Sequence, residues 1–483
     1  MNKINNAYIN ALLADAAYVE NLAGGSLAGA LKERMTEPVA NFIANNFEVI
    51  TQQETGDIVG SGFDATVWRG KLGTLYSGEV YISFQGSLGF ADFADDDDLA
   101  LKWAATEQIT DMINWWKRIT TPKGEMVQQF KLVPIAGEVI PILYQTDDAE
   151  GTGELVGVTS VHVNGHSLGG HLASVFVRFF GGMVNIEDVY TYNSAGFNII
   201  SELFFKQLDF LLQTGGSEFY EGQNNYFAEN GISITTNDWW FNQIGIRQEI
   251  FNEESSILIY QNHSIYKLVD TLALGNLLGK LDKNLTLKTL NDLLSQASNE
   301  TESSLEKALD QFRQLILNKT NDTLVGDDNE EAPSRVNYHE NLAELEESKI
   351  FQALTKHDNL QIQATTAALA VQDNEIGIAH RYALAKLNAY ALIGVDYSQH
   401  NNGELDLYDA KNNIGQMTQN WLTDRNTLLS IKNILNKYDF DYQKVFSLDY
   451  NGSYWGVGES GDLKDFPELR QFKGKNLKII DKD

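Results

Sequence analysis

The stretch VHVNGHSLGGHLA, residues 161–173, decides the fold. Valine alternates with polar residues at its start, as in a β-strand, and an apolar helical pattern follows its end. Between them lies Gly-x-Ser-x-Gly centred on Ser167, the pattern of a nucleophile elbow. Such a turn needs glycine at Gly165 and Gly169, because side chains there would collide with neighbouring backbone. We predict that a strand beginning near Leu155 turns sharply into a helix and presents Ser167 as a nucleophile.

The composition is that of a globular protein, with 483 residues, 43% of them hydrophobic and 21% charged. A net charge of −30 argues against nucleic acid as a partner and against tight docking on anionic membranes. The chain has no cysteine, which excludes disulfides and thiolate metal sites. We find no apolar run of transmembrane length and no secretory signal peptide. These features suit a cytoplasmic protein or one secreted by a signal-peptide-independent route.

Hydrophobic periodicity predicts strands that alternate with helices along the first half of the chain. The predicted helices lie within residues 6–46, 107–119 and 264–278, and the predicted strands at 47–50, 65–69, 80–84, 189–192 and 225–228. This alternation predicts an α/β fold with a mainly parallel sheet. The unusually apolar residues 203–212 are either a buried helix or a cover over an apolar substrate site.

Three regions are expected from the change in pattern along the chain. Residues 1–280 form the α/β domain, and residues 281–375 form a mainly helical, polar insertion with an acidic loop. Residues 376–483 are mixed and are expected to pack on or extend the first domain. Within them, residues 378–392 and 421–435 are predicted to be helical.

Two backbone N–H groups are candidates for stabilising an oxyanion beside Ser167. One belongs to Leu168, at the start of the helix after the elbow, where the helix dipole is positive. The other belongs to Ser87, which closes a predicted strand and could use its N–H or its hydroxyl. Four aspartates follow at residues 95–98 and form a solvated charge run, a helix N-terminal cluster or a calcium site.

With residues 165–170, the earlier Phe-Gln-Gly-Ser at 84–87 and the later His263, residues 1–280 resemble the class 3 (fungal-type) lipases. The resemblance implies an α/β-hydrolase domain that acts on lipid esters. Gln85 stands where that family carries arginine, and the Asp-Pro-Val that usually supplies its catalytic acid is missing.

The chain is still more similar to bacterial lipase and phospholipase A1 domains found in large exported proteins with calcium-binding repeat tails. The matching motifs extend well beyond the elbow and lie at residues 192–196, 262–270, 387–391 and 424–425. This chain has no repeat tail, so the resemblance leaves the export route open.

Ester hydrolysis needs a nucleophile, a base and a carboxylate that orients the base. In α/β-hydrolases these occur in the chain order Ser, Asp/Glu, His, so His263 is the predicted base. Asp238 and Glu229 are alternative acids, and Asp270 is expected to be a surface or packing residue. Three histidines at the elbow are expected to be structural, and four later ones remain alternative bases: His162, His166 and His171, then His339, His357, His380 and His400.

The sequence therefore predicts a serine esterase, either a triacylglycerol lipase or a phospholipase A1, that acts on lipid at an interface. Its chemistry requires no cofactor, although the family likeness leaves room for a structural calcium ion. The alternatives are a non-catalytic binding or effector protein on a hydrolase scaffold, or an enzyme acting on a protein or thioester acyl group. An exported effector would also have an immunity or chaperone protein as a partner.

Overall fold

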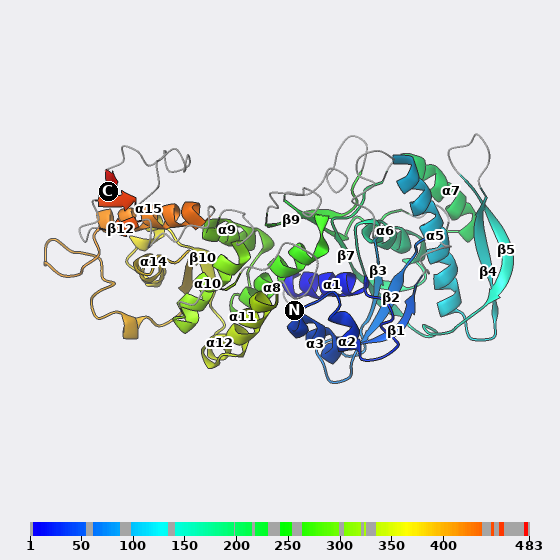
Figure 1. Ribbon diagram of the computed structural model, residues 1–483, viewed down its shortest axis with the longest axis horizontal. Coiled ribbons are helices and arrows are strands. Elements are labelled where there is room, and N and C mark those ends of the chain that lie inside the picture. The colour runs from blue at the N-terminus through cyan, green and yellow to red at the C-terminus, as the bar shows by residue number, and fades with distance from the viewer. Residues whose placement is uncertain are drawn as a thin grey trace.

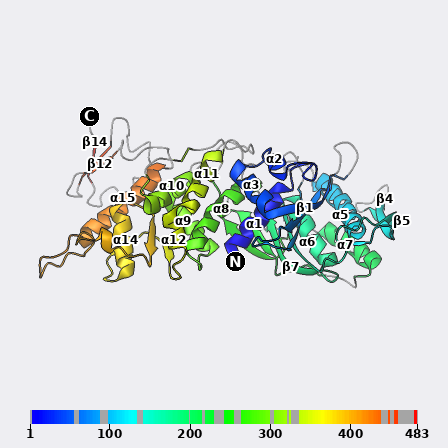
Figure 2. The same ribbon diagram turned by 90° about the horizontal axis from the view of Figure 1, so that it is seen from below.

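The computed structural model describes most of the chain. The described residues are 3–54, 61–86, 98–133, 141–197, 199–214, 218–229, 242–253, 263–298, 304–319, 323–324, 335–436, 446–448, 454–457 and 478–481. An α/β part and a mainly helical part lie side by side along the long axis (Figure 1). The N-terminus lies near their junction and the C-terminus near the far end of the helical part, as both views show (Figures 1 and 2).

A mainly parallel sheet forms the centre of the α/β part. In the described residues its order is β1-β2-β3-β6-β7-β8-β9, and its strands are β1 (Phe47–Gln53), β2 (Ala65–Gly70), β3 (Val80–Phe84), β6 (Ser160–His166), β7 (Asn185–Tyr192), β8 (Asn224–Ala228) and β9 (Ile246–Ile250). Neighbours from β3 to β9 pair in parallel, whereas β1-β2 and β2-β3 pair antiparallel. The predicted α/β fold with a mainly parallel sheet is therefore confirmed.

Helices cover both faces of this sheet, and the central strand β3 is therefore buried along its whole length. On β3, Tyr81 faces one hydrophobic core and Ile82 faces the other. The first core holds α1 (Lys3–Ala16) and α8 (Ile265–Leu281). The second holds α5 (Asp98–Thr120), α6 (Leu168–Phe180) and α7 (Ile199–Leu212). Two shorter helices, α2 (Leu27–Leu31) and α3 (Glu37–Asn46), complete the first core.

Two features of the α/β part differ from the sequence prediction. The strand before the elbow begins at Ser160 and not near Leu155, because residues 154–157 form a turn. An antiparallel hairpin of β4 (Met126–Val133) and β5 (Ile142–Glu150) also precedes it, which the periodicity did not reveal. The hairpin packs Phe130 and Leu143 inward and leaves Tyr144 exposed.

The apolar residues 203–212 belong to α7, which is a half-buried helix. Phe204, Phe205 and Leu208 are buried in the second core. Leu203 and Phe210 are 48% and 81% exposed. One face of this helix is therefore part of the core, and the other is turned to solvent.

The helical part begins at α8 and shares its core with the α/β part. Its elements are α9 (Leu287–Ser298), α10 (Ser304–Leu317), α11 (Val336–Glu347), α12 (Lys349–Leu354), β10 (Gln361–Ala364), α13 (Ala367–Ala370), α14 (Glu375–Ala385), β11 (Tyr390–Ile393), a 3-10 turn (Ser398–His400), α15 (Gln419–Asn436), β12 (Phe446–Leu448), β13 (Tyr454–Val457) and β14 (Lys478–Asp481). One hydrophobic core runs from α1 through α8 into α9, α10 and α11. The boundary predicted near residue 280 thus crosses a shared core.

The helix predicted over residues 378–392 is wrong in its second half. Helix α14 ends at Ala385, and the chain reverses at Leu387, which has φ of 49°. The next residues form β11, which pairs antiparallel with β10 and is buried along its whole length. A short apolar run fits a buried strand and a buried helix equally well, so the periodicity could not separate the two.

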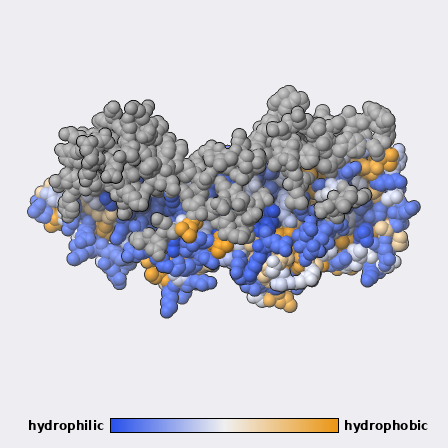
Figure 3. All heavy atoms as spheres, viewed as in Figure 1, coloured by the Kyte–Doolittle hydropathy of each residue, from blue (hydrophilic) through white to orange (hydrophobic). Residues whose placement is uncertain are grey.

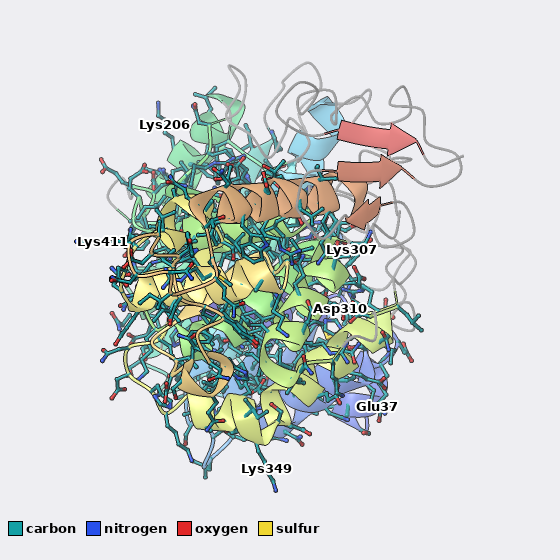
Figure 4. The ribbon with its side chains drawn as sticks, turned by 90° about the vertical axis from the view of Figure 1, so that its left-hand side faces the viewer. Glu37, Lys206, Lys307, Asp310, Lys349 and Lys411 are labelled. Carbon is teal, nitrogen blue, oxygen red and sulfur yellow. The ribbon has the colours of Figure 1, made fainter. Side chains whose placement is uncertain are left out.

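Much of the described surface is polar, although some charged side chains, such as Asp270 and Arg335, are buried. The face in Figure 3 is mostly hydrophilic where it is described, and Lys349 and Lys411 point outward in the end-on view of Figure 4. Over the described residues, none of the helices is both long and apolar enough to cross a membrane.

Candidate active site

Ser167 lies at a strained turn between β6 and α6. Its φ of 59° and ψ of −126° are unusual for a residue with a side chain. A Cβ on Gly165 would lie 2.2 Å from the Gly169 carbonyl oxygen, and a Cβ on Gly169 would lie 2.1 Å from that of Phe84. The prediction that side chains at both positions would meet backbone is therefore confirmed. The turn, the strand before it and the helix after it complete an α/β-hydrolase fold.

Backbone hydrogen bonds with β7 and the residues that follow it hold the elbow in place. The Ser167 N–H donates to the Tyr192 carbonyl at 3.0 Å, and the Ala195 N–H donates to the Ser167 carbonyl at 3.1 Å. The strained residue is thus fixed on both sides. Its side chain lies at the carboxyl end of a parallel strand, where α/β folds place their ligands.

His263 lies beside Ser167, although 96 positions separate them in the chain. Its Nε2 is 2.8 Å from the Ser167 Oγ, a normal hydrogen-bond distance. Burial lowers the pKa of His263 to about 4, so the imidazole is neutral at pH 7. A neutral imidazole at this distance can accept the proton of the serine hydroxyl.

Neither candidate acid is placed against His263 by the described contacts. A carboxylate oxygen of Glu229 accepts the Asn252 N–H at 3.3 Å, and the Glu229 N–H donates to the Ile250 carbonyl. Asp238 lies outside the described residues. The choice between the two carboxylates therefore stays a prediction.

The two predicted oxyanion donors differ in how well they can be located. Leu168 is the first residue of α6, and the N–H groups of a first helical turn have no partner within the helix. It directly follows Ser167, so its N–H lies beside the nucleophile. Ser87 lies outside the described residues, and the chain is described up to Gly86.

The remaining histidines contact other groups. His162 bonds Asp188 at 2.8 Å, and His171 stacks on Phe197. Burial lowers the pKa of His171 to about 4. The later histidines lie in other surroundings: His339 contacts Asp270, His380 accepts the Thr366 N–H, and His357 and His400 are exposed.

Asp270 is buried, and it forms an ion pair with Arg335 at 2.6 Å. It therefore packs inside the molecule, one of the two predicted alternatives. For metals, the described residues contain no group of three or more histidine, aspartate or glutamate side chains that could hold an ion. Of the aspartates at 95–98, the first three lie outside the described residues.

Three residues support the site, and of these only His166 was singled out from the sequence, as a structural histidine. His166 and Asn193 both contact the carbonyl oxygen of His263, at 2.8 and 3.0 Å, and Tyr18 contacts His166. His166 occupies the x position of the elbow pattern, and Asn193 lies within the motif at 192–196. Nothing in the sequence around Tyr18 marks it.

Comparisons with known proteins give only distant matches. No protein-family profile matches the chain, and no curated protein does. Among solved structures, the chain is similar to lipase II from Rhizopus niveus, with a TM-score of 0.33 and 13% identity over 55% of this chain and 92% of that one. It is also similar to the Lip2 lipase from Yarrowia lipolytica, with a TM-score of 0.30 and 12% identity over 55% and 87% of the two chains. At these TM-scores neither similarity assigns an activity to this chain.

Proposed function

We propose that this protein is a serine esterase that hydrolyses carboxyl esters of lipids. The observation that carries the proposal is the 2.8 Å contact between the Ser167 Oγ and the His263 Nε2 at a strained elbow. Strain of this kind is energetically unfavourable, by about 1–3 kcal/mol, and is retained mainly at functional sites. A serine at such a turn beside a neutral histidine is the arrangement that activates a nucleophile.

The reaction proceeds through an acyl-enzyme. Ser167 Oγ attacks the ester carbonyl carbon while His263 Nε2 takes its proton, and the N–H of Leu168 stabilises the oxyanion, with Ser87 as the proposed second donor. The tetrahedral intermediate collapses, the bond to the alcohol breaks, and His263 returns the proton to the leaving alkoxide. Water then attacks the acyl carbonyl while His263 takes its proton, the bond to Ser167 Oγ breaks to release the fatty acid, and His263 returns the proton to Ser167. Asp238 or Glu229 orients the imidazole, and the steps require no cofactor.

The substrate proposed is a triacylglycerol or a phospholipid cleaved as by phospholipase A1. The motifs shared with bacterial lipase and phospholipase domains support this choice, because they extend past the elbow to residues 192–196 and 262–270. The exposed apolar residues Leu203 and Phe210 on α7 are consistent with work at a lipid interface.

Hydrolysis of p-nitrophenyl butyrate by the purified chain tests the proposal. Ser167→Ala should lower kcat by about 10⁴-fold or more, because a lost nucleophile removes the acyl-enzyme route. Ser174→Ala is the matched control, since Ser174 is also a buried serine. Its hydroxyl donates to the Gly170 carbonyl and accepts from the Gln223 side chain. Hydrolysis that survives Ser167→Ala, or a folded wild-type protein without any esterase activity, contradicts the proposal.

The lipid class is tested separately. Phosphatidylcholine vesicles, a trioctanoin emulsion and an acyl-thioester are incubated with wild-type protein, and the released products are identified. Fatty acid released from the sn-1 position of the vesicles indicates a phospholipase A1, and fatty acid from the emulsion indicates a lipase. Release from the thioester alone contradicts a lipid ester as substrate.

A further inference from the structure

One hydroxyl group joins two of the segments that surround Ser167. Tyr18 follows α1, and its oxygen is 3.1 Å from the N–H of Gly86 and 2.8 Å from Nδ1 of His166. Gly86 follows β3, and His166 is the last residue of β6, directly before the nucleophile. Tyr18 thus bridges the end of β3 to the elbow.

His166 extends this chain of hydrogen bonds to the base. Its Nε2 is 2.8 Å from the carbonyl oxygen of His263. A carbonyl oxygen can only accept a hydrogen bond, so Nε2 of His166 carries the ring proton. Nδ1 of the neutral ring is then a hydrogen-bond acceptor. Tyr18 must then donate to Nδ1, and its oxygen accepts the Gly86 N–H. The three hydrogen bonds from Gly86 through Tyr18 and His166 to His263 therefore all run in the same direction.

His166 is suited to this place because it stays uncharged. Burial, and secondarily the nearby His263, lower the pKa of His166 well below its usual value. The two imidazole rings are 4.9 Å apart between centroids. A charged His166 would oppose the imidazolium that forms on His263 during catalysis, whereas a neutral one leaves that step unopposed.

Tyr18 is itself held firmly. The guanidinium of Arg34 lies 4.5 Å from the centre of the Tyr18 ring, and Arg34 pairs with the buried Asp15 at 2.7 Å. Gly86 fits closely on the other side, because a Cβ there would lie 2.6 Å from the Tyr18 hydroxyl. The hydroxyl therefore has little room to move relative to the end of β3.

We propose that Tyr18 and His166 are positioning residues that hold the His263 backbone and the end of β3 in register with Ser167. The inference rests on the proposed esterase function, and it adds a role for a residue outside the sheet. Catalysis depends on such register, since a displacement of about 1 Å is enough to lower a rate about 10²-fold. Neither residue touches the reacting atoms.

Tyr18→Phe removes only the hydroxyl that bridges Gly86 and His166. We expect kcat for p-nitrophenyl butyrate to fall about 10- to 100-fold, with KM unchanged within about twofold, because the base and the end of β3 lose register with Ser167 while substrate contacts remain. Tyr397→Phe is the matched control: it also removes a buried hydroxyl, which bonds the Leu392 carbonyl at 2.6 Å in the helical part. It should leave kcat within about twofold.

A pair of variants at His166 tests the same bond from the other side. His166→Gln keeps an N–H donor near the Nε2 position, whereas His166→Leu has none. We expect the glutamine variant to have at least about tenfold higher kcat than the leucine variant, because only its amide can still hold the His263 carbonyl.

The outcomes separate this inference from the proposed function. If Ser167→Ala abolishes hydrolysis but Tyr18→Phe behaves like Tyr397→Phe, the positioning role is wrong and the esterase stands. A change confined to KM also contradicts positioning. If Ser167→Ala leaves hydrolysis intact, the esterase proposal itself fails.

Discussion

Two buried polar clusters each include a residue at the N-terminal end of α8. One includes His263, just before the helix, and the other includes Asp270, seven residues later in its second turn. The uncharged cluster consists of Ser167, His166 and His263, joined at 2.8 Å by neutral hydrogen bonds. The charged cluster consists of Asp270, Arg335 and His339, with contacts of 2.6 and 3.0 Å to the aspartate.

The two clusters differ in strain and in charge. The charged cluster ties α8 to the neighbourhood of α11, and His339 continues to Thr36 at the start of α3 at 2.9 Å. Burial raises the pKa of Asp270, but its ion pair with Arg335 and its contact with His339 outweigh this and hold the pKa below its usual value. The uncharged cluster instead contains a residue at an unfavourable φ and a base kept neutral by burial. Paired charge without strain suits a structural role, whereas strain beside a neutral base suits catalysis.

The largest expected change in stability is at Arg335. Arg335→Met leaves the Asp270 carboxylate buried without its ion pair, which should lower the free energy of unfolding by about 3–5 kcal/mol. The activity per folded molecule should not change, because the cluster does not touch Ser167. Urea unfolding and kcat at 25 °C measure both. Lys283→Met is the control, since it breaks the exposed pair with Asp358, and a loss of kcat at Arg335 would contradict the separation of roles.

A smaller difference in stability is expected between two substitutions at the elbow. Ser167→Gly should be more stable than Ser167→Ala by about 1–2 kcal/mol, because glycine tolerates a φ of 59° and alanine does not. Both variants lack the hydroxyl that contacts His263 and should be inactive. The difference in stability between them therefore reports mainly on backbone strain. Thermal and urea unfolding of the two proteins give the difference. A more stable alanine variant would show that the turn is not strained.

The smallest expected effect is that of mild acid on activity. The base must be neutral to accept the serine proton, and burial lowers the pKa of His263 to about 4. kcat/KM should therefore stay constant from pH 8 down past about 6.5, the usual value for histidine, and fall only at lower pH. A pH profile with p-nitrophenyl butyrate measures this. A decline that already begins near pH 7 would mean that the base is not buried during catalysis.

The sequence was most informative where local geometry and chemistry coincide. The elbow needs glycine at Gly165 and Gly169 for steric reasons, so a five-residue pattern predicted the turn. The order of groups along the chain then singled out His263, which the structure places 2.8 Å from Ser167. Alternating strands and helices predicted the mainly parallel sheet in the same local way.

Features of the structure that depend on contacts between residues far apart in the chain could not be predicted from the sequence. Asp270 is buried because Arg335, 65 positions away, neutralises it, and no local pattern announces such a pair. Tyr18 reaches His166 across 148 positions. The strand at 390–393 is similar: its burial comes from pairing with β10, while its short apolar run alone is ambiguous.

The most direct test of the central claim is covalent labelling of Ser167 by a fluorophosphonate probe, followed by peptide mass spectrometry. The arrangement of Ser167 and His263 predicts a single adduct on Ser167, absent in Ser167→Ala and at least about 10³-fold slower in His263→Ala. An unlabelled folded protein, or an adduct on another residue that persists in Ser167→Ala, would contradict it.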